Sequence, residues 1–501
     1  MSQNQNLLWS VEEAVAATGG TLDGDELAGL ITGISIDTRT LEKNDLFVAL
    51  QDVRDGHDFV SAAFAKGAAM ALVSHDYQKT KADGLLLRVA EPLEGLRKMA
   101  AAARARLGQQ ARVIAVTGSA GKTTTKEMLR ICFAALGKVH ASEKSYNNHW
   151  GVPLTLARMP KDTDFAVIEI GMNHAGEIKP LSELSRPHVA LITSVLPVHL
   201  EHFSGIEAIA AAKAEIFAGL CQSGWAIIPR DASQYVFLAQ QAAAVVGASF
   251  EEVMEHRAKR VVSFGEHPDS FTIVDNIKLE LTKSRAVLRS AHAGFDDSIG
   301  FEVGLPGRHN VLNASACLSA WSCATAGLDI ALNAEQSRPG LEGALRALAH
   351  MSMEPVGRGQ VFELANEKTG AVTLIDESYN ANPASMRAAF ENLSLYPTDR
   401  RKVAVIGDML ELGTGSPDLH AALVGPLQEA GIDIVFACGA HMKTMYDQLP
   451  AQMRGAYALD AQELKPILLG ALHARDIVMV KGSNGSKLGS VVEALKTNFS
   501  L

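Results

Sequence analysis

The stretch that decides the fold reads Thr117-Gly118-Ser119-Ala120-Gly121-Lys122-Thr123-Thr124-Thr125. It follows an apolar run at 113–116 and precedes a helix-like segment at 126–136. A strand, a glycine loop and a helix in this order are typical of a phosphate-binding loop. The two glycines let backbone N–H groups turn toward an anion, the helix N-terminus adds partial positive charge, and Lys122 adds a full one. The Thr123 hydroxyl is suited to the Mg²⁺ that accompanies a nucleoside triphosphate.

The glycine spacing differs from the usual pattern, in which four residues separate the two glycines. Here only Ser119 and Ala120 lie between Gly118 and Gly121. The alternative is a helix-capping turn that happens to contain a lysine. The surrounding strand and helix favour the phosphate-binding loop, and the rest of the chain must indicate what the phosphate is used for.

Length and composition limit the possible classes of protein. A chain of 501 residues is too long for one core, and a domain size of roughly 150 residues predicts about three domains. We expect boundaries at 1–88, 89–330 and 331–501. A hydrophobic content of 47% with 20% charged residues is that of an ordinary soluble protein. The net charge of −10 argues against a nucleic-acid-binding surface.

The sequence also predicts where the protein works. Its five cysteines are scattered, without C-x-x-C spacing, which indicates reduced thiols and disfavours a disulfide framework or a zinc site. The first residues lack the basic and apolar regions of a signal peptide, and no apolar run approaches the ~18 residues of a membrane span. We therefore expect a cytoplasmic protein without membrane insertion.

The pattern along the chain predicts an α/β protein. Residues 10–73 read as a small α/β unit that opens with a capping box at 10–13, and an Ala/Arg-rich helix at 96–107 leads to the next domain. From residue 111, apolar runs at 112–117, 165–170, 189–195 and 225–229 alternate with helical patterns, which predicts a largely parallel sheet with antiparallel strands added between 271 and 305. A second doubly wound, Rossmann-like pattern has strand candidates at 372–376, 402–407, 433–438 and 476–480. These alternate with helical stretches at 384–396, 419–431 and 488–498.

Polar residues near the ends of apolar runs are the first candidates for a site, because ligands bind beyond the carboxyl ends of parallel strands. Glu169 lies near the end of the run 165–171 and is placed to ligate Mg²⁺; the alternative is an edge-strand carboxylate that faces solvent. His199 follows the run 189–195, although a lone histidine is more often structural. Spacing alone leaves Lys213 as a solvated lysine on a helix.

Two asparagine clusters lie in predicted loops, at 146–153 and 376–383. Asn-x-Asn-Pro also forms good turns, so a structural role stays open for the second cluster. The segments 307–310 and 481–483 place glycine beside basic or amide groups at the ends of elements, which suits nucleotide or phosphate contacts.

Taken together, these residues resemble the Mur ligase family of ATP-dependent amide-bond ligases in peptidoglycan synthesis. The segments 169–178, 379–383 and 407–413 carry the resemblance most specifically. They are most similar to the branch that joins D-alanyl-D-alanine to UDP-N-acetylmuramoyl-tripeptide. The resemblance implies an N-terminal UDP-sugar domain, a central P-loop ATPase and a C-terminal Rossmann-like domain, with ATP and Mg²⁺ as cofactors.

The resemblance also implies roles that spacing does not give. Thr123, Glu169, His199 and Lys213 are implied as metal ligands, His199 for a second Mg²⁺ and Lys213 after carbamylation. The residues implied at the reaction centre are Lys122, Glu169, His199, Lys213, Asn147 and Asn148. Those implied around the nucleotide are Gly118, Gly121, Lys122, Thr123, Thr124, His309, Asn310, Asn380 and Asn382. Those implied for the substrate are Thr38, Arg39, Asp55, Gly56 and His57 on a uridine-nucleotide face, with Lys481 and Ser483 in the third domain.

The implied reaction passes through an acyl phosphate that the dipeptide amine attacks, while domain closure excludes water. The family pattern leads us to expect arginine where this chain has Asn484, which puts in question how the third domain clamps its substrate. The alternatives are a sister ligase that adds an amino acid, a P-loop nucleotide switch, and a non-catalytic binding module. We expect a monomer, and the third residue of the peptide is not indicated.

Overall fold

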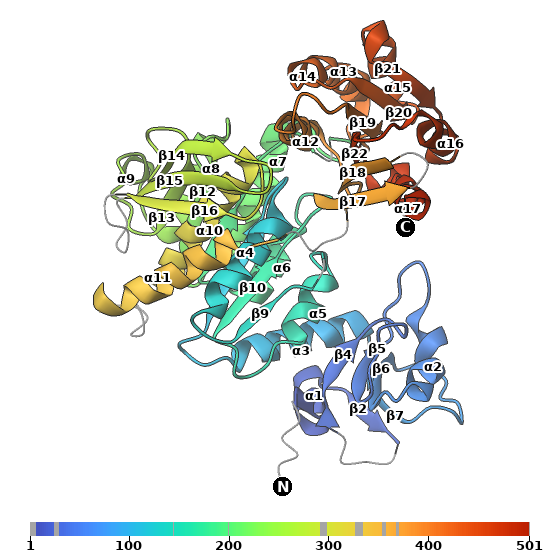
Figure 1. Ribbon diagram of the computed structural model, residues 1–501. Coiled ribbons are helices and arrows are strands. Elements are labelled where there is room, and N and C mark those ends of the chain that lie inside the picture. The colour runs from blue at the N-terminus through green and yellow to red at the C-terminus, as the bar shows by residue number, and fades with distance from the viewer. Residues whose placement is uncertain are drawn as a thin grey trace.

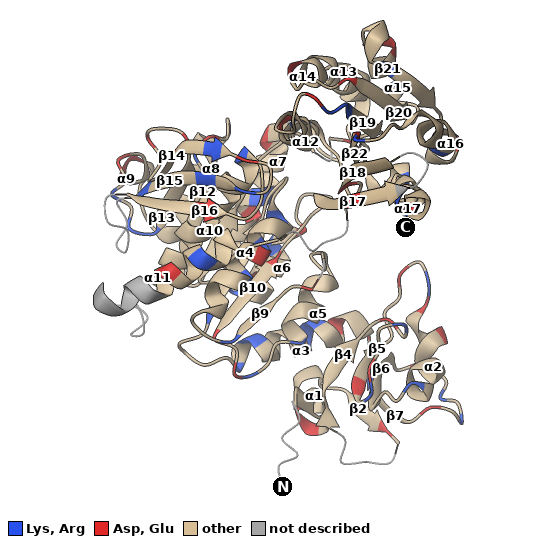
Figure 2. Cartoon of the chain, in the orientation of Figure 1, with Lys and Arg blue, Asp and Glu red and all other residues tan. Residues whose placement is uncertain are grey.

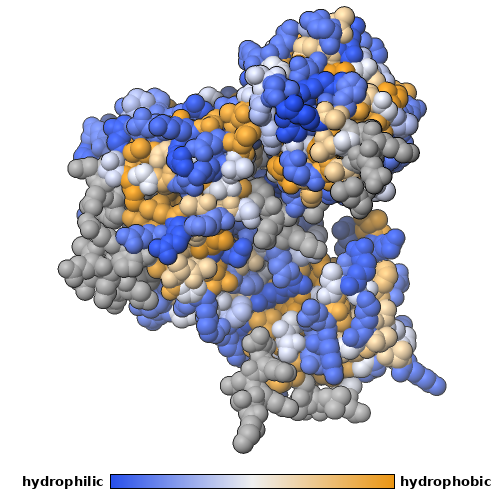
Figure 3. Space-filling model, viewed as in Figure 1, coloured by the Kyte–Doolittle hydropathy of each residue, from blue (hydrophilic) through white to orange (hydrophobic). Residues whose placement is uncertain are grey.

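Three α/β units follow each other along the chain in the computed structural model (Figure 1). The structure describes residues 7–24, 30–143, 145–198, 200–290, 298–325, 334–352, 357–366 and 370–499. In Figure 1 the C-terminal unit (orange to red) lies at the upper right of the central unit, and the N-terminal unit (blue) lies at its lower right. Figure 3 shows a gap between these two units on the same face. None of the helices in the described ranges is long and apolar enough to cross a membrane.

The N-terminal unit is built on a sheet in the order β2-β7-β6-β5-β4, in which only β2 is antiparallel to its neighbour. Its strands are β2 (Thr21–Asp23), β4 (Gly33–Ser35), β5 (Asp45–Val48), β6 (Met70–Ser74) and β7 (Leu85–Val89), with β1 (Trp9–Ser10) paired to β3 (Leu30–Ile31). Its helices are α1 (Val11–Thr18), α2 (Val60–Ala65) and the connecting α3 (Pro92–Ala105). The predicted capping box is confirmed, because Ser10 and Glu13 exchange hydrogen bonds at the start of α1.

The central unit holds a nine-stranded sheet in the order β16-β15-β14-β13-β12-β11-β8-β10-β9. The strands are β8 (Arg112–Thr117), β9 (Val139–Ala141), β10 (Phe165–Glu169), β11 (Val189–Ile192), β12 (Trp225–Pro229), β13 (Val261–Gly265), β14 (Thr272–Leu279), β15 (Ser284–Ser290) and β16 (Ile299–Val303). Along this sheet order, neighbouring strands from β9 through to β14 pair in parallel. The pairs β14–β15 and β15–β16 are antiparallel, as predicted. The apolar run of β8 is buried on both faces because helices cover the sheet on each side.

Helices of the central unit are α4 (Lys122–Ala134), α5 (Gly151–Ala157), α6 (Ile178–Ser185), α7 (Ile206–Ala214), α8 (Tyr235–Val246), α9 (Phe250–Met254), α10 (Arg308–Thr325) and α11 (Ala334–Ala349). The last of these, α11, packs against α4 and β16. The central unit therefore extends past the predicted boundary at residue 330, and this packing favours a boundary after residue 349. Helical periodicity could not assign α11 to a unit, since the period gives an apolar face but not its partner.

The C-terminal unit is a second doubly wound sheet, in the order β17-β18-β22-β19-β20-β21. Its strands are β17 (Gln360–Asn366), β18 (Gly370–Glu377), β19 (Lys402–Gly407), β20 (Ile434–Cys438), β21 (Arg454–Ala458) and β22 (Ile477–Lys481). Its helices are α12 (Pro383–Ser394), α13 (Ser416–Ala421), α14 (Val424–Glu429), α15 (Met442–Gln448), α16 (Ala461–Ala471) and α17 (Gly489–Asn498). The helical stretch predicted at 419–431 is two short helices, because Pro426 has no N–H to continue one ladder.

Charged residues of both signs are interspersed in all three units (Figure 2). The net charge of −10 nevertheless lies outside the central unit, because residues 89–349 carry 26 acidic and 26 basic side chains, residues 1–88 carry 13 and 7, and residues 350–501 carry 17 and 13.

Candidate active site

A cavity of about 540 Å³ lies between the central and C-terminal units. Its walls come from the carboxyl ends of β8 and β10, the start of α10, and the segments that lead into β17 and follow β18. The predicted residues that line it are Gly121, Lys122, Thr123, Thr124, Asn147, Asn148, Glu169, His309, Asn310, Asn380, Asn382 and Lys481. Tertiary folding thus brings together residues separated by more than 350 positions in the sequence.

The glycine loop turns between β8 and α4 with two glycines in conformations that other residues rarely adopt. Gly118 has φ +155°, and a Cβ there would lie 1.9 Å from Thr193 Oγ1. Gly121 has φ +80°, and its Cβ would lie 2.4 Å from Asn313 Oδ1. Both positions therefore need glycine, for backbone conformation and for space. Gly121 is also the N-cap of α4, so the helix starts at the cavity wall.

Lys122 is the first residue of α4, and its Nζ donates a hydrogen bond to Gly118 O at 2.7 Å. Desolvation lowers the pKa of Lys122 and Arg358 lowers it further, while the Glu169 carboxylate opposes both. A cation with little water around it interacts strongly with a negative ligand. This is the arrangement that a phosphate-binding lysine requires.

Glu169 closes β10 and is only 1% exposed, so the alternative of a solvent-facing edge carboxylate is wrong. The reason is the strand order, in which β10 lies between β8 and β9. Glu169 Oε1 accepts hydrogen bonds from Thr123 Oγ1 at 3.2 Å and Asn147 Nδ2 at 2.7 Å. Its Oε2 is buried without a hydrogen-bond partner. A buried carboxylate oxygen of this kind is costly unless a cation binds it, so the donor set fits Mg²⁺.

No group of three or more His, Cys, Asp or Glu side chains suited to a metal occurs in the described ranges. His199 lies outside those ranges. Because Mg²⁺ commonly keeps several waters and takes one or two carboxylates plus phosphates, the pair of Thr123 and Glu169 is a sufficient protein contribution.

Lys213, on α7, is 2% exposed, so the expectation of a solvated lysine is wrong. Its ammonium group forms no hydrogen bond or ion pair with any residue that the structure describes. Burial, and then the nearby Lys122 charge, hold the pKa of Lys213 well below its usual value. A neutral, buried amine is the form of lysine that reacts as a nucleophile.

The asparagine side chains on the other walls use part of their hydrogen-bonding capacity on nearby backbone groups. Asn310 Nδ2 donates to Pro306 O at 2.7 Å. Asn380 Oδ1 accepts the N–H of Ala381, and Asn382 Oδ1 accepts the N–H of Ser385 as the N-cap of α12. The structural interpretation of the Asn-x-Asn-Pro turn is therefore correct, and both asparagines still line the cavity.

The two predicted residues at the end of β22 differ in position. Lys481 lines the cavity, where its Nζ donates to Glu377 Oε2 at 3.2 Å and to the Asn380 carbonyl at 3.1 Å. Ser483 is buried away from the cavity wall, and its Oγ accepts the N–H of Leu410 at 3.0 Å. Asn484, next along the chain, is exposed.

Two polar residues that sequence reasoning missed, Arg358 and Asn313, line the cavity. Arg358 stacks on the Tyr379 ring at 4.4 Å and has no ion pair in the described part of the chain. Asn313 lies one helical turn after Asn310, on the same face of α10. That spacing could have identified Asn313, whereas a single arginine between two glycines carries no signal.

The predicted uridine-nucleotide residues form a second face, on the N-terminal unit, and do not line the cavity. Thr38 and Arg39 follow β4, and the segment 55–57 follows β5, so both lie beyond the carboxyl ends of adjacent parallel strands. Arg39 forms an exposed ion pair with Asp37 at 2.7 Å.

Gly56 approaches the chain closely on this face, because a Cβ there would lie 2.5 Å from Leu50 O. Next to it, the N–H of Ser74 donates to His57 Nε2 at 3.0 Å. The proton of the His57 imidazole is therefore on Nδ1, where it is donated to Asp55 Oδ1 at 2.6 Å. The ring of His57 is fixed from both nitrogens.

Fold and site together define a three-domain protein whose P-loop lines a cavity between its second and third domains. The chain belongs to the Mur ligase family. Residues 116–321 match the Mur ligase middle domain, and residues 357–484 match the Mur ligase, glutamate ligase domain.

Similar proteins span nearly the whole chain. A UDP-N-acetylmuramoyl-tripeptide–D-alanyl-D-alanine ligase of Rickettsia prowazekii is 32% identical over 92% of this chain and 94% of its own length. The Escherichia coli ligase of the same name is 33% identical over 96% of each chain. The crystal structure of MurF from Acinetobacter baumannii superposes with a TM-score of 0.79 at 28% identity, covering 98% of this chain and 99% of that one.

Proposed function

We propose that this chain is an ATP-dependent carboxylate–amine ligase that joins D-alanyl-D-alanine to UDP-N-acetylmuramoyl-tripeptide, with release of ADP and phosphate, in peptidoglycan precursor synthesis. The observation that carries the proposal is Glu169, a buried carboxylate with one unpartnered oxygen beside the glycine loop of an interdomain cavity. The family membership and the names of its near full-length relatives support the choice of substrates.

The metal ligands follow from the same observation. The Thr123 hydroxyl and Glu169 would hold Mg²⁺ with the ATP phosphates. Lys213 would react as a neutral amine with CO₂, forming an N–C bond and releasing a proton, and the carbamate would serve a second Mg²⁺ with His199. Bound Mg²⁺ supplies neutralisation of charge on the phosphate oxygens.

The reaction has two transfers. A tripeptide carboxylate oxygen bonds to the γ-phosphorus of ATP as the bond to ADP breaks, which gives an acyl phosphate. The dipeptide amine then attacks the acyl carbon and loses a proton, and phosphate leaves. Lys122 neutralises charge that develops on the transferring group. Arg358 lies in the same cavity, without an ion pair among the described residues, and is placed to do the same.

The remaining residues have supporting roles in the proposal. In this proposal Asn147 and Asn148 would act near the reacting groups, His309 and Asn310 near the adenine, and Asn380 and Asn382 on the C-terminal side of the nucleotide. Their shared position on the cavity wall supports these roles. Lys481 binds substrate from the third domain, and Ser483 supports that segment. The face of Thr38, Arg39 and 55–57 binds the uridine nucleotide.

Closure of the units would bring the acid and the amine to the P-loop and exclude water from the acyl phosphate. The gap between the N-terminal and C-terminal units leaves room for such a movement (Figure 3). We further propose that the protein acts as a cytoplasmic monomer.

Phosphate release from ATP tests the function, with UDP-N-acetylmuramoyl-tripeptide and D-alanyl-D-alanine each omitted in turn. Release that requires both substrates supports the ligase. Sustained release without the dipeptide, or none with both present, would refute it. Replacing the dipeptide with single amino acids distinguishes a sister ligase, and preference for GTP over ATP would favour a nucleotide switch.

A further inference from the structure

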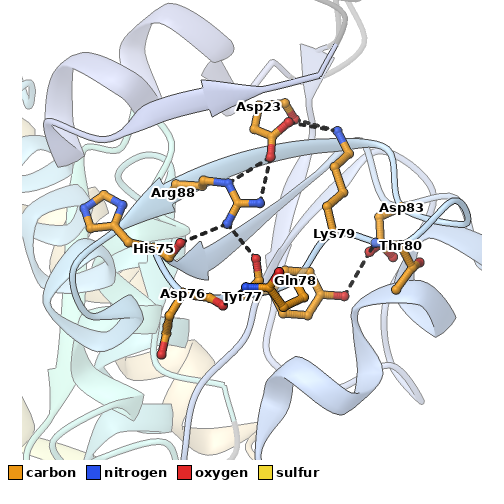
Figure 4. Close-up of polar contacts among 9 residues, drawn as sticks. All are labelled: Asp23, His75, Asp76, Tyr77, Gln78, Lys79, Thr80, Asp83 and Arg88. Atoms are coloured by element: carbon orange, nitrogen blue, oxygen red, sulfur yellow. Dashed lines mark hydrogen bonds and ion pairs between the residues drawn. The ribbon is translucent and has the colours of Figure 1, made fainter.

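The segment between β6 and β7, residues 75–83, begins at the carboxyl end of β6, beside the proposed nucleotide face. The side chain of Arg88, on the strand that follows, binds the first residues of this segment. Arg88, on β7, donates from Nη1 to the carbonyl oxygens of Tyr77 at 2.8 Å and His75 at 3.2 Å (Figure 4). Main-chain carbonyls bound in this way fix the path of the loop itself, whatever its side chains do.

Arg88 is in turn fixed from its other side. Its Nε and Nη2 donate to Asp23 Oδ2 at 2.8 and 2.7 Å, and Asp23 ends the edge strand β2. Lys79 returns from the loop and donates to the Asp23 carbonyl oxygen at 2.8 Å. All three guanidinium nitrogens of Arg88 are bound within the protein, and its side chain is 17% exposed. Arg88 therefore has little left to offer a ligand directly.

Tyr77, in the 75–83 segment, is the residue that contacts His57. The Tyr77 ring stacks on the His57 ring, with centroids 5.4 Å apart and planes at 30°. The Tyr77 hydroxyl donates to Asp83 Oδ2 at 2.9 Å, and Asp83 also accepts from Ser61 Oγ at 2.7 Å. Desolvation and then the Asp83 carboxylate raise the pKa of Tyr77 to about 12, so this hydroxyl remains a donor throughout the working pH range.

We propose that Arg88 is a positioning residue for the uridine nucleotide of the substrate: it holds the 75–83 loop so that Tyr77 stays stacked on the His57 ring of the nucleotide face, in addition to the contacts that hold the two ring nitrogens. The inference rests on the proposed function for the identity of the ligand. It goes beyond that function because neither Arg88 nor Asp23 belongs to the nucleotide face.

Loop order determines affinity here through the population of the binding-competent state. Fixing the backbone costs about 1–2 kcal/mol for each residue ordered, so a loop without Arg88 would be ordered for only part of the time. The apparent Kd equals the intrinsic Kd divided by the fraction of molecules in the binding-competent state. If about 10% of the molecules have an ordered loop, the apparent Kd is therefore tenfold higher. Catalysis in the distant cavity, once substrate is saturating, is unaffected.

The test compares wild type, Arg88→Ala and Asp23→Ala in binding of UDP-N-acetylmuramoyl-tripeptide by calorimetry and in steady-state kinetics. We expect both variants to raise the Kd and KM for this substrate about tenfold. The kcat and the KM values for ATP and D-alanyl-D-alanine stay as in wild type. Amide hydrogen exchange should quicken in residues 75–83 and not in the strands of the sheet.

Arg97→Ala is the matched control, because Arg97 is an arginine of the neighbouring helix α3 whose ion pair with Glu94 spans 3.7 Å at the surface. It should bind the substrate like wild type. If wild type does not bind the UDP-substrate, the proposed function fails. If wild type binds and Arg88→Ala binds equally well, or if every KM rises together with general loss of stability, the positioning role is overturned. Asp23→Asn, which keeps an acceptor for Arg88, should show a smaller effect in the same direction.

Discussion

Replacing Glu169 by glutamine should separate folding from nucleotide binding. The amide keeps an oxygen for Thr123 and Asn147, whose hydrogen bonds both reach Oε1. The substitution removes the negative charge from a buried oxygen that has no hydrogen-bond partner, and this favours folding. It also removes the attraction between the carboxylate and Lys122, and this loss opposes folding. Because these effects offset each other, we expect the free energy of unfolding without ligand to change by no more than about 1 kcal/mol.

Ligand-induced stabilisation should respond very differently. At a Mg-ATP concentration of 100 times Kd, the wild-type protein gains about 2.7 kcal/mol. Loss of a charged metal ligand raises Kd by roughly 100-fold, so at the same concentration the Glu169→Gln variant gains only about 0.4 kcal/mol. Activity should fall by a factor of at least about 100.

Thermal unfolding with and without Mg-ATP measures the ligand-induced stabilisation, and substrate-dependent phosphate release measures the activity. Glu183→Gln is the control, since Glu183 is an exposed glutamate of α6 whose distance to Lys179 is 4.0 Å. Equal stabilisation of Glu169→Gln and wild type by Mg-ATP would refute the metal-binding role. A loss of several kcal/mol without ligand would instead make Glu169 a structural acid.

Three other substitutions test separate parts of the structure. Lys213→Ala should lose activity at least about 100-fold and recover part of it with added formate or acetate, because a small carboxylate can replace the carbamate in the space left. Gly121→Ala should raise the KM for ATP about tenfold, because left-handed backbone costs about 1–2 kcal/mol and the new Cβ meets Asn313 Oδ1 at 2.4 Å. Burial, and then three nearby arginines, lower the pKa of His188 to about 4, so the unfolded chain binds more protons between pH 6.5 and 4. Stability should fall by roughly 3 kcal/mol as the pH drops through this range and should not fall further below it; denaturant titrations at several pH values measure this.

Each of these has its own control. Lys213→Met fills the space and should not respond to carboxylates; rescue of the methionine variant would contradict the carbamate. Gly247→Ala has the same left-handed strain, at φ +71°, but no atom within 4 Å, so it should leave the KM for ATP unchanged. His188→Asn keeps an acceptor for the Val113 N–H and should remove this part of the pH dependence; an unchanged pH profile would show that other groups cause it.

Local features were predictable because they depend on residues close together in the chain. The glycine loop between β8 and α4, the capping box of α1 and the antiparallel strands β14 to β16 all follow from spacing and backbone preference. The family resemblance supplied roles for Lys213, His309 and the 55–57 segment that spacing does not give. It left their surroundings undetermined.

Only the tertiary structure decided which groups lose their water and which partners they meet. Glu169 and Lys213 are buried because of strand order and helix packing, which no local pattern encodes. The same holds for Arg358, which reaches the cavity only where the central and C-terminal units meet. Desolvation and pairing depend on residues remote in sequence, and these determine the charge, pKa and reactivity of each side chain. The sequence by itself therefore determined a P-loop and an α/β chain of three units, while the fold decided how its charged groups form a site.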